Sequence, residues 1–302
     1  MLSRLAAFPL AIALLTAIAA AQGRGPLELA NAPVAEGAQR IPYGALPLQF
    51  GELRVPPTKG PHPVAIVIHG GCWLSRLGKY PPQAVALDNM RPLAAALTAA
   101  GIATWNIEYR RLGDEGGGWP GTFRDVAIAA DHIRALAPTH GLDLTRAISI
   151  GHSAGAHFAL WLAARPKLSA TSELFTRDPV RLAGVVSLDG PADLRATIAL
   201  QRPVCGSPVI TDLLGGTPEE RPERYRDGSP IEQLPFGVPQ VFFTGLMFDA
   251  HAAPYEAAVK RAGDIAETIA SPKAGHFVFI DPQSEMWPRV MTSVRRLLSM
   301  AP

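Results

Sequence analysis

Short, continuous runs of apolar residues recur along the chain, and most are bounded by glycine, proline or charged residues. Runs of this kind are typical of strands that are buried on both faces of a parallel sheet. We therefore predict strands at 46–55 (a strand or hairpin), 64–69, 102–108, 146–150, 182–188, 240–244 and 265–270.

Segments with helical apolar spacing lie between these runs, for example Val126, Ala129, Ala130 and Ile133. Helices are predicted at 84–100, 123–136, 154–164, 254–262 and 287–298. Strands that alternate with helices predict an α/β domain, here over residues 40–302, with a mostly parallel sheet and helices on both faces. About fifty residues rich in Pro, Gly, Arg and Glu separate two of the strands, and we expect a small lid insertion at about 190–238.

The N-terminus differs from the rest of the chain. Arg4 precedes an uncharged, mostly apolar stretch that ends in Ala19-Ala20-Ala21, which predicts a signal peptide at 1–21. The alternative is an uncleaved membrane anchor. With cleavage, the mature protein would be secreted or periplasmic and free of the membrane.

The overall composition excludes some classes of protein. The 302 residues are 48% apolar and 18% charged, with a net charge of +2 and no Lys/Arg-rich run. The composition therefore gives no sign of a basic surface that would bind nucleic acid. The recurring apolar runs argue against a disordered chain. The composition makes no prediction about oligomeric state.

Candidate chemistry begins at Gly151-His152-Ser153-Ala154-Gly155, a G-x-S-x-G pattern between a predicted strand and a predicted helix. In that setting a tight turn exposes the serine hydroxyl above the sheet, which makes Ser153 the candidate nucleophile. The alternative is a glycine-rich turn with an incidental serine.

A serine hydroxyl needs a base, and the base needs a carboxylate to orient it. His276 follows the last predicted strand and is the candidate base. Asp249 follows the strand at 240–244 and is the favoured acid. Asp189, at the end of the preceding strand, is the rival, because it could reach the same histidine from a neighbouring position.

The segment His69-Gly70-Gly71-Cys72-Trp73 ends the first long buried strand. Its glycines would let backbone N–H groups approach an oxyanion, so we expect Gly71, Cys72 and Ala154 to donate there. His69 is interpreted as structural. The other histidines show no metal-ligand spacing, and we predict neither a metal nor another cofactor.

The two cysteines, Cys72 and Cys205, would meet an oxidising environment after export. Cys72 lies in the glycine-rich loop and Cys205 begins the insertion that should cover the same sheet edge. We predict a disulfide between them, with two separate buried thiols as the alternative.

Several motifs carry a broader resemblance, and they cover nearly all of the chain after residue 40. They are HGGCW (69–73), WNIEYRR (105–111), GGGWPGTFRDV (116–126), GHSAGAH (151–157), SLDGPADL (187–194), LLGGTPEERPERY (213–225) and GHFVFIDPQS (275–284). The chain resembles bacterial α/β-hydrolases of the kynurenine formamidase-like and carboxylesterase group. The resemblance implies esterase or arylformamidase chemistry with Ser153, Asp249 and His276 as the triad. Two positions depart from the pattern: Ala156 replaces a usual glycine, and the turn that carries Asp249 is irregular.

For the substrate, Trp73 and Trp119 are candidate pocket residues, with packing as the alternative role. Export argues against tryptophan catabolism, so we expect an exported carboxylesterase for small or aryl esters, including acyl groups on carbohydrates. The alternatives are an arylformamidase and a catalytically inactive binding protein on the same fold. An exported peptidase would usually need a large extra domain, for which this chain has no room.

Overall fold

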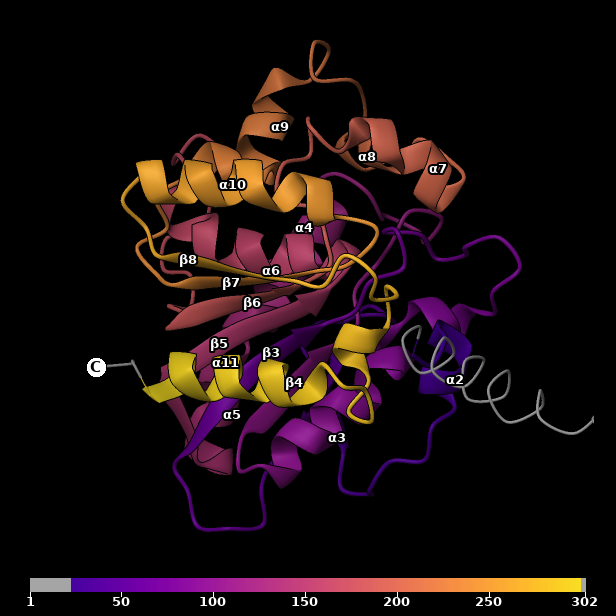
Figure 1. The fold of residues 1–302 in the computed structure, drawn as a ribbon. Helices are drawn as coiled ribbons and strands as arrows, with labels where there is room; N and C mark the ends of the chain where they lie inside the picture. The colour runs from indigo at the N-terminus through magenta and orange to yellow at the C-terminus, as the bar shows by residue number, and fades with distance from the viewer. Residues whose placement is uncertain (1–22, 300–302) are drawn as a thin grey trace, which may run out of the picture.

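A computed structural model describes residues 23–299 of the chain. Its centre is an eight-stranded sheet with the order β1-β2-β4-β3-β5-β6-β7-β8 (Figure 1). β2 pairs antiparallel with β1 and β4, and all the other neighbouring strands are parallel. The strands are β1 (Gln39–Pro42), β2 (Phe50–Arg54), β3 (His62–Ile68), β4 (Ala103–Ile107), β5 (Leu142–His152), β6 (Gly184–Leu188), β7 (Gln240–Thr244) and β8 (Ala266–Ala270). The predicted, mostly parallel sheet is confirmed, and β1 is a strand that the pattern did not predict separately.

The apolar runs are continuous because both faces of the sheet are covered. In β3, Val64, Ile66 and Ile68 belong to one hydrophobic core, whereas Ala65 and Val67 belong to the core on the opposite face. Successive side chains of a strand point to opposite faces, so a strand between two cores is apolar on both faces.

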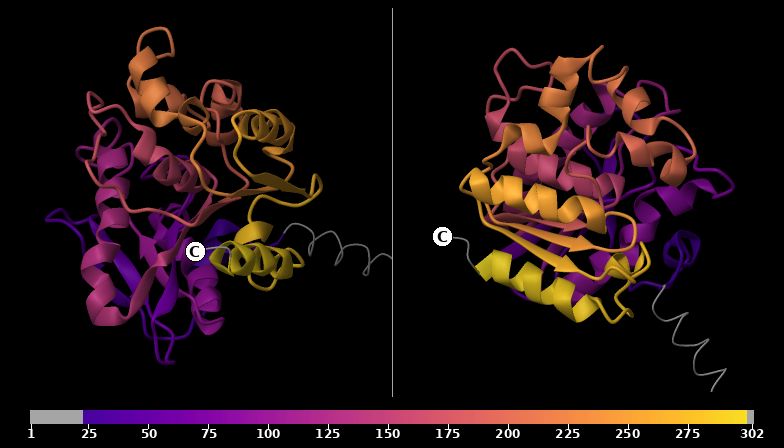
Figure 2. Two further views of the ribbon diagram at one scale, coloured as in Figure 1. Left: turned by 90° about the vertical axis from the view of Figure 1, so that its left-hand side faces the viewer. Right: turned by 45° about the horizontal axis from the view of Figure 1, so that its top comes forward.

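Helices form a layer on each face, as Figure 2 shows for α10 and α11 on opposite sides of the sheet. The first layer contains α4 (Gly121–Asp131), α5 (Ile133–His140), α6 (Ala154–Ala164) and α10 (Asp249–Arg261). The second contains α2 (Pro26–Ala30), α3 (Arg91–Ala99) and α11 (Trp287–Ser299). The predicted arrangement of helices on both faces is therefore confirmed.

Three predicted helices have different bounds in the structure. The segment predicted as one helix at 123–136 forms two, α4 and α5. The segment predicted as one helix at 84–100 is divided into two 3₁₀ turns, η1 (Pro82–Val85) and η2 (Leu87–Met90), followed by α3. Pro92 lies in the first turn of α3, where its missing N–H is not needed, and it favours a new start there. α10 begins at Asp249 rather than at Pro254, so this proline lies inside the helix.

The segment between β6 and β7 is folded rather than extended. It contains η4 (Ile198–Leu200), α7 (Gln201–Cys205), α8 (Val209–Leu214), α9 (Pro222–Gly228) and η5 (Pro230–Gln233). Figure 1 shows α7, α8 and α9 beyond α10 and α4, at the outer side of that helix layer. All four apolar side chains of α8 are buried in the core on that face. We call residues 189–239 the insertion.

The predicted signal peptide, 1–21, lies outside the described residues. Within residues 23–299, no helix combines the length and the apolar character needed to cross a bilayer.

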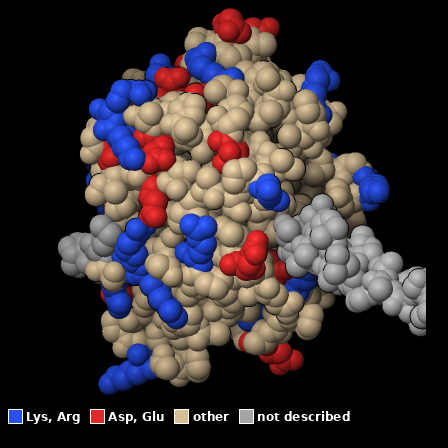
Figure 3. Space-filling model, viewed as in Figure 1, with Lys and Arg blue, Asp and Glu red and all other residues tan. Residues whose placement is uncertain are grey.

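On the face drawn in Figure 3, basic and acidic side chains are interspersed among large uncharged areas. Two further 3₁₀ turns, η3 (Arg165–Lys167) and η6 (Val278–Ile280), follow α6 and β8.

Candidate active site

Ser153 occupies the turn between β5 and α6, as the sequence predicted. Its backbone has φ 56° and ψ −123°, a conformation that costs energy for a residue with a side chain. The turn is so tight that a Cβ atom at Gly151 would collide with the carbonyl of Gly155. The sequence Gly-His-Ser-Ala-Gly thus forms this turn because only glycine leaves room for it, and the turn holds Ser153 at the carboxyl edge of the sheet.

The partner of His276 is Asp189. The Nδ1–H of His276 donates a hydrogen bond of 2.7 Å to Asp189 Oδ2. Asp189 directly follows β6 and has no exposed surface, while 14% of the His276 side chain is exposed. The other carboxylate oxygen accepts a 2.9 Å hydrogen bond from the backbone N–H of Gly245. With Nδ1 protonated in this way, Nε2 of His276 is left to accept a proton.

The favoured prediction of Asp249 as the acid was wrong, and the rival Asp189 takes its place. Asp249 is the first residue of α10, where its Oδ1 accepts a 3.0 Å hydrogen bond from Thr244 Oγ1. The N-terminus of a helix stabilises a carboxylate, so Asp249 has a structural reason to lie there. The residue that faces the histidine from this turn is Phe248, whose ring centroid lies 6.3 Å from that of His276.

His152, next to the nucleophile, supports the loop that carries His276. Its ring is buried, and Nε2–H donates a 3.0 Å hydrogen bond to the backbone carbonyl of His276. Burial, together with the nearby charge of His276, lowers the pKa of His152 well below its ordinary value. His152 therefore remains a neutral donor, and the ring of His276 lies 4.3 Å from it.

The glycine-rich loop after β3 presents its backbone toward Ser153. Gly71, Cys72 and Trp73 all have positive φ angles, of 97°, 57° and 56°. Among the described residues, the amides of Gly71 and Cys72 have no backbone acceptor. Ala154 is the first residue of α6, so its N–H has no acceptor within the helix. These three amides match the predicted oxyanion donors.

His69 lies beneath this loop and is structural, as predicted. Its Nε2 is 2.9 Å from Glu108 Oε1, and its Nδ1 is 2.8 Å from the carbonyl oxygen of Gly70. Although burial opposes it, the interaction with His69 lowers the pKa of Glu108.

Two hollows meet at Ser153. The narrower, of about 330 Å³ when its open mouth is counted, is mostly apolar. We call it the inner chamber, and its walls are Cys72, Trp73, Ala154, Pro191, Thr197, Leu200, Gln201, Val204, Cys205, Val209, Ile210 and Phe248. The wider, of about 630 Å³, contains His276 and is partly lined by Tyr80, Met247 and Phe277. Ser153 and His276 thus both face the wider hollow. No hydrogen bond joins Ser153 Oγ to His276. Such bonds often tighten only when substrate is bound.

Of the two predicted tryptophans, only Trp73 lines a hollow beside Ser153. Trp119 does not, and this prediction was wrong. Its Nε1–H donates to Glu173 Oε1 over 3.1 Å, and its ring packs against Phe123 with centroids 5.1 Å apart. Trp119 therefore packs its own loop, residues 116–120, against α4.

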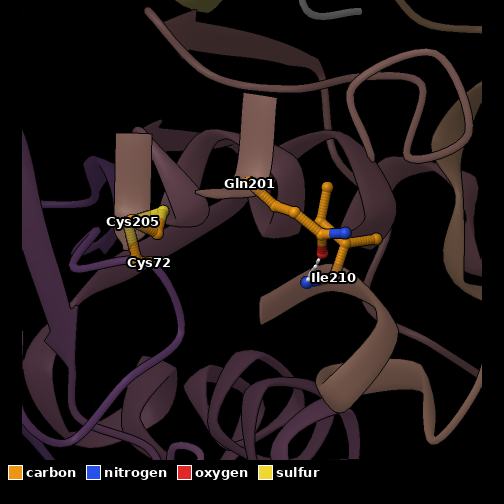
Figure 4. Close-up of a disulfide and its surroundings, with 4 residues drawn as sticks. All are labelled: Cys72, Gln201, Cys205 and Ile210. Atoms are coloured by element: carbon orange, nitrogen blue, oxygen red, sulfur yellow. Dashed lines mark hydrogen bonds between the residues drawn. A yellow bond between two sulfur atoms is a disulfide. The ribbon is translucent and has the colours of Figure 1, made fainter. Parts of the chain in front are cut away.

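The predicted disulfide is present. Cys72 of the glycine-rich loop is bonded to Cys205 at the end of α7, with their Cα atoms 5.9 Å apart (Figure 4). The described residues contain no cluster of His, Cys, Asp or Glu that could hold a metal ion.

The sequence did not identify the apolar walls of the two hollows. Leu200, Val204, Val209 and Ile210 come from the insertion, and Phe248 comes from the turn after β7. In the sequence they are ordinary apolar residues. The only available signal was that an insertion follows Asp189 at the edge of the sheet where Ser153 lies.

Comparison with solved structures identifies the fold. A truncated carbohydrate esterase from gut microbiota superposes with a TM-score of 0.70 and 19% identity, over 91% of this chain and 100% of that one. Esterase B from Lactobacillus rhamnosis has a TM-score of 0.75 and 18% identity, over 97% and 93%. Esterase 2 from Thermogutta terrifontis has a TM-score of 0.63 and 18% identity, over 87% and 92%. With the strand order above, these similarities establish the α/β-hydrolase fold.

At the level of sequence, no curated protein matches the chain significantly. A family model, described as BD-FAE, matches residues 52–245. That segment contains Ser153, Asp189 and the glycine-rich loop, and it covers more than half of the chain. The protein described here therefore belongs to the BD-FAE family.

Proposed function

We propose that the protein is a serine carboxylesterase with Ser153, His276 and Asp189 as its catalytic triad. The buried Asp189–His276 pair is the observation that carries the proposal, because it orients the histidine beside a hollow that it shares with Ser153. A hydrogen bond from a buried carboxylate fixes the tautomer of the histidine and stabilises the imidazolium that forms.

The geometry supports a two-step reaction. His276 Nε2 takes the proton of Ser153 while the hydroxyl oxygen attacks the ester carbonyl. The amides of Gly71, Cys72 and Ala154 donate to the oxyanion of the tetrahedral intermediate. The alcohol leaves with the proton from His276, and a water molecule then releases the acid from Ser153 by the same steps.

For the substrate we propose small or aryl esters, including acyl groups on carbohydrates. One structural neighbour is named as a carbohydrate esterase, and another is named as a bifunctional GH43-CE protein of Bacteroides eggerthii, of which this chain covers only 39%. The aromatic residues Tyr80 and Phe277 in the wider hollow would suit an aryl group. They equally suit the alternative, an arylformamidase of the kynurenine formamidase-like group.

We also propose that the protein is exported, with residues 1–21 as its signal peptide. The Cys72–Cys205 disulfide supports this, because disulfides persist in the periplasm and outside the cell.

Labelling with a fluorophosphonate probe tests the proposal. The native protein should be labelled once, and Ser153→Ala should be folded, unlabelled and slower on p-nitrophenyl butyrate by at least ~10³-fold. A folded protein that takes no label would be an inactive binding protein. A panel of p-nitrophenyl esters, acetylated sugars and N-formylkynurenine then decides the substrate, and N-formylkynurenine as the best substrate would favour the arylformamidase.

A further inference from the structure

The inner chamber beside Ser153 is bounded mainly by the insertion. Leu200, Gln201, Val204 and Cys205 come from the end of η4 and from α7, and Ile210 comes from α8. Opposite them are Ala154, one of the proposed oxyanion donors, and Trp73, which follows the donor Cys72. The distance between α7 and the glycine-rich loop therefore sets the width of this chamber.

α7 cannot hold its position by its own helical hydrogen bonds. It has only five residues, and isolated helices shorter than ~12 residues are marginal in water. Apart from Gln201, its side chains are partly or fully exposed. Val204 and Cys205 pack against the core that buries α8, and the rest of its support comes from specific ties to the domain.

Two ties hold α7, one at each end, and Figure 4 shows both. At its last residue, the disulfide joins Cys205 to Cys72 in the glycine-rich loop. At its first residue, Gln201 Oε1 accepts a 2.9 Å hydrogen bond from the backbone N–H of Ile210. This amide is in the first turn of α8 and has no acceptor within that helix, so Gln201 satisfies it. α8 is in turn fixed by its buried apolar side chains.

We propose that the Cys72–Cys205 disulfide and Gln201 fix the wall of the inner chamber and restrict the enzyme to esters of compact apolar acyl groups. The inference rests on the proposed esterase function. The free space inside the chamber is little larger than a water molecule, so we expect short acyl groups such as acetyl to fit best. Longer chains would have to displace α7, which both ties prevent.

The disulfide is also open to reduction. Cys205 is partly exposed, so a dithiol can reach the bridge. The bridge takes up two electrons and two protons and gives two thiols, while the dithiol is oxidised to its own disulfide. Reduction should therefore widen the range of acyl groups without any change in the triad.

The test is the ratio of kcat/KM for p-nitrophenyl octanoate to that for p-nitrophenyl acetate. It is measured for the native protein, for Cys205→Ser, for Gln201→Ala and for native protein treated with dithiothreitol. We expect the ratio to rise about tenfold in Cys205→Ser and after reduction, and less in Gln201→Ala, since one methylene in a pocket changes the rate by ~10–200-fold. Arg202→Gln is the matched control, because Arg202 is an exposed residue of α7 whose side chain has no partner among the described residues.

Each outcome is decisive. An unchanged ratio in folded Cys205→Ser and after reduction would overturn the inference and leave the proposed function intact. Two free thiols in the unreduced, denatured native protein would also overturn it. If native protein hydrolyses none of the esters, the proposed function fails instead. If Cys205→Ser does not fold, the reduced native protein and Gln201→Ala still give the ratio.

Discussion

Asp189→Asn tests which aspartate orients His276. In the native protein, one carboxylate oxygen accepts from His276 Nδ1–H and the other from the Gly245 N–H. Asparagine has only one acceptor oxygen, and the Gly245 amide requires an acceptor, so the new NH₂ group must face the histidine. It would donate to Nδ1 and drive the ring proton to Nε2. The tautomer that results cannot take the proton of Ser153.

The expected loss in kcat is about 10⁴-fold, as for the same change in a serine protease triad, or about 5.4 kcal/mol at 1.36 kcal/mol per decade. Asp249→Asn is the matched control. Because Thr244 Oγ1 can donate to the remaining oxygen, we expect a change within about threefold, which corresponds to ~0.65 kcal/mol. Both variants would be compared with the native protein on p-nitrophenyl butyrate, with thermal melting as the check on folding. A larger loss in Asp249→Asn than in a folded Asp189→Asn would refute the assignment.

Two further predictions concern stability. Burial lowers the pKa of His157 to about 4. Below pH ~6.5 the unfolded state therefore binds a proton that the folded state does not, and the free energy of unfolding falls by about 3 kcal/mol as the pH falls to 4. The urea midpoint should therefore be lower at pH 5 than at pH 7. This difference should shrink in His157→Gln but not in His140→Gln. Arg24 donates to Asp281 over 3.0 Å and, against the effect of burial, lowers the pKa of that carboxyl. Arg24→Gln should therefore lower the free energy of unfolding by about 1–3 kcal/mol at pH 7, and this effect should vanish as the pH falls through the lowered pKa of Asp281. An equal loss of stability at pH 7 and pH 3 would contradict this.

The sequence predicted the positions of Ser153 and His276 in the fold because the signals are local. The turn at Ser153 needs small residues at fixed positions, since Gly151 and Gly155 are in backbone contact. His276 follows the last strand, and no later histidine competes with it. The continuous apolar runs likewise predicted the sheet, because strands between two helical layers have no polar face.

The carboxylate partner of His276 could not be chosen in the same way. Asp189 and Asp249 both follow strands whose carboxyl ends lie side by side, and both precede His276 in the chain. The choice depends on where the backbone turns after β7, which puts the Gly245 amide on Asp189 and Asp249 in the first turn of α10. Neither contact leaves a pattern in the sequence. Trp73 and Trp119 were indistinguishable for a similar reason, since both follow glycine-rich segments.

Because Asp189 follows β6, the turn after β7 does not supply the partner of His276. The backbone N–H of Asp189 donates to the carbonyl of Phe243 over 2.7 Å, and the preceding residue, Leu188, accepts from the Ser153 amide over 2.9 Å. These backbone hydrogen bonds hold Asp189 and Ser153 together at the edge of the sheet. The turn after β7 lines the two hollows instead. Its Phe248 lines the inner chamber, and its Met247 lines the wider hollow. A position that the sequence predicted to carry the acid thus belongs to a segment that shapes both sides of the site.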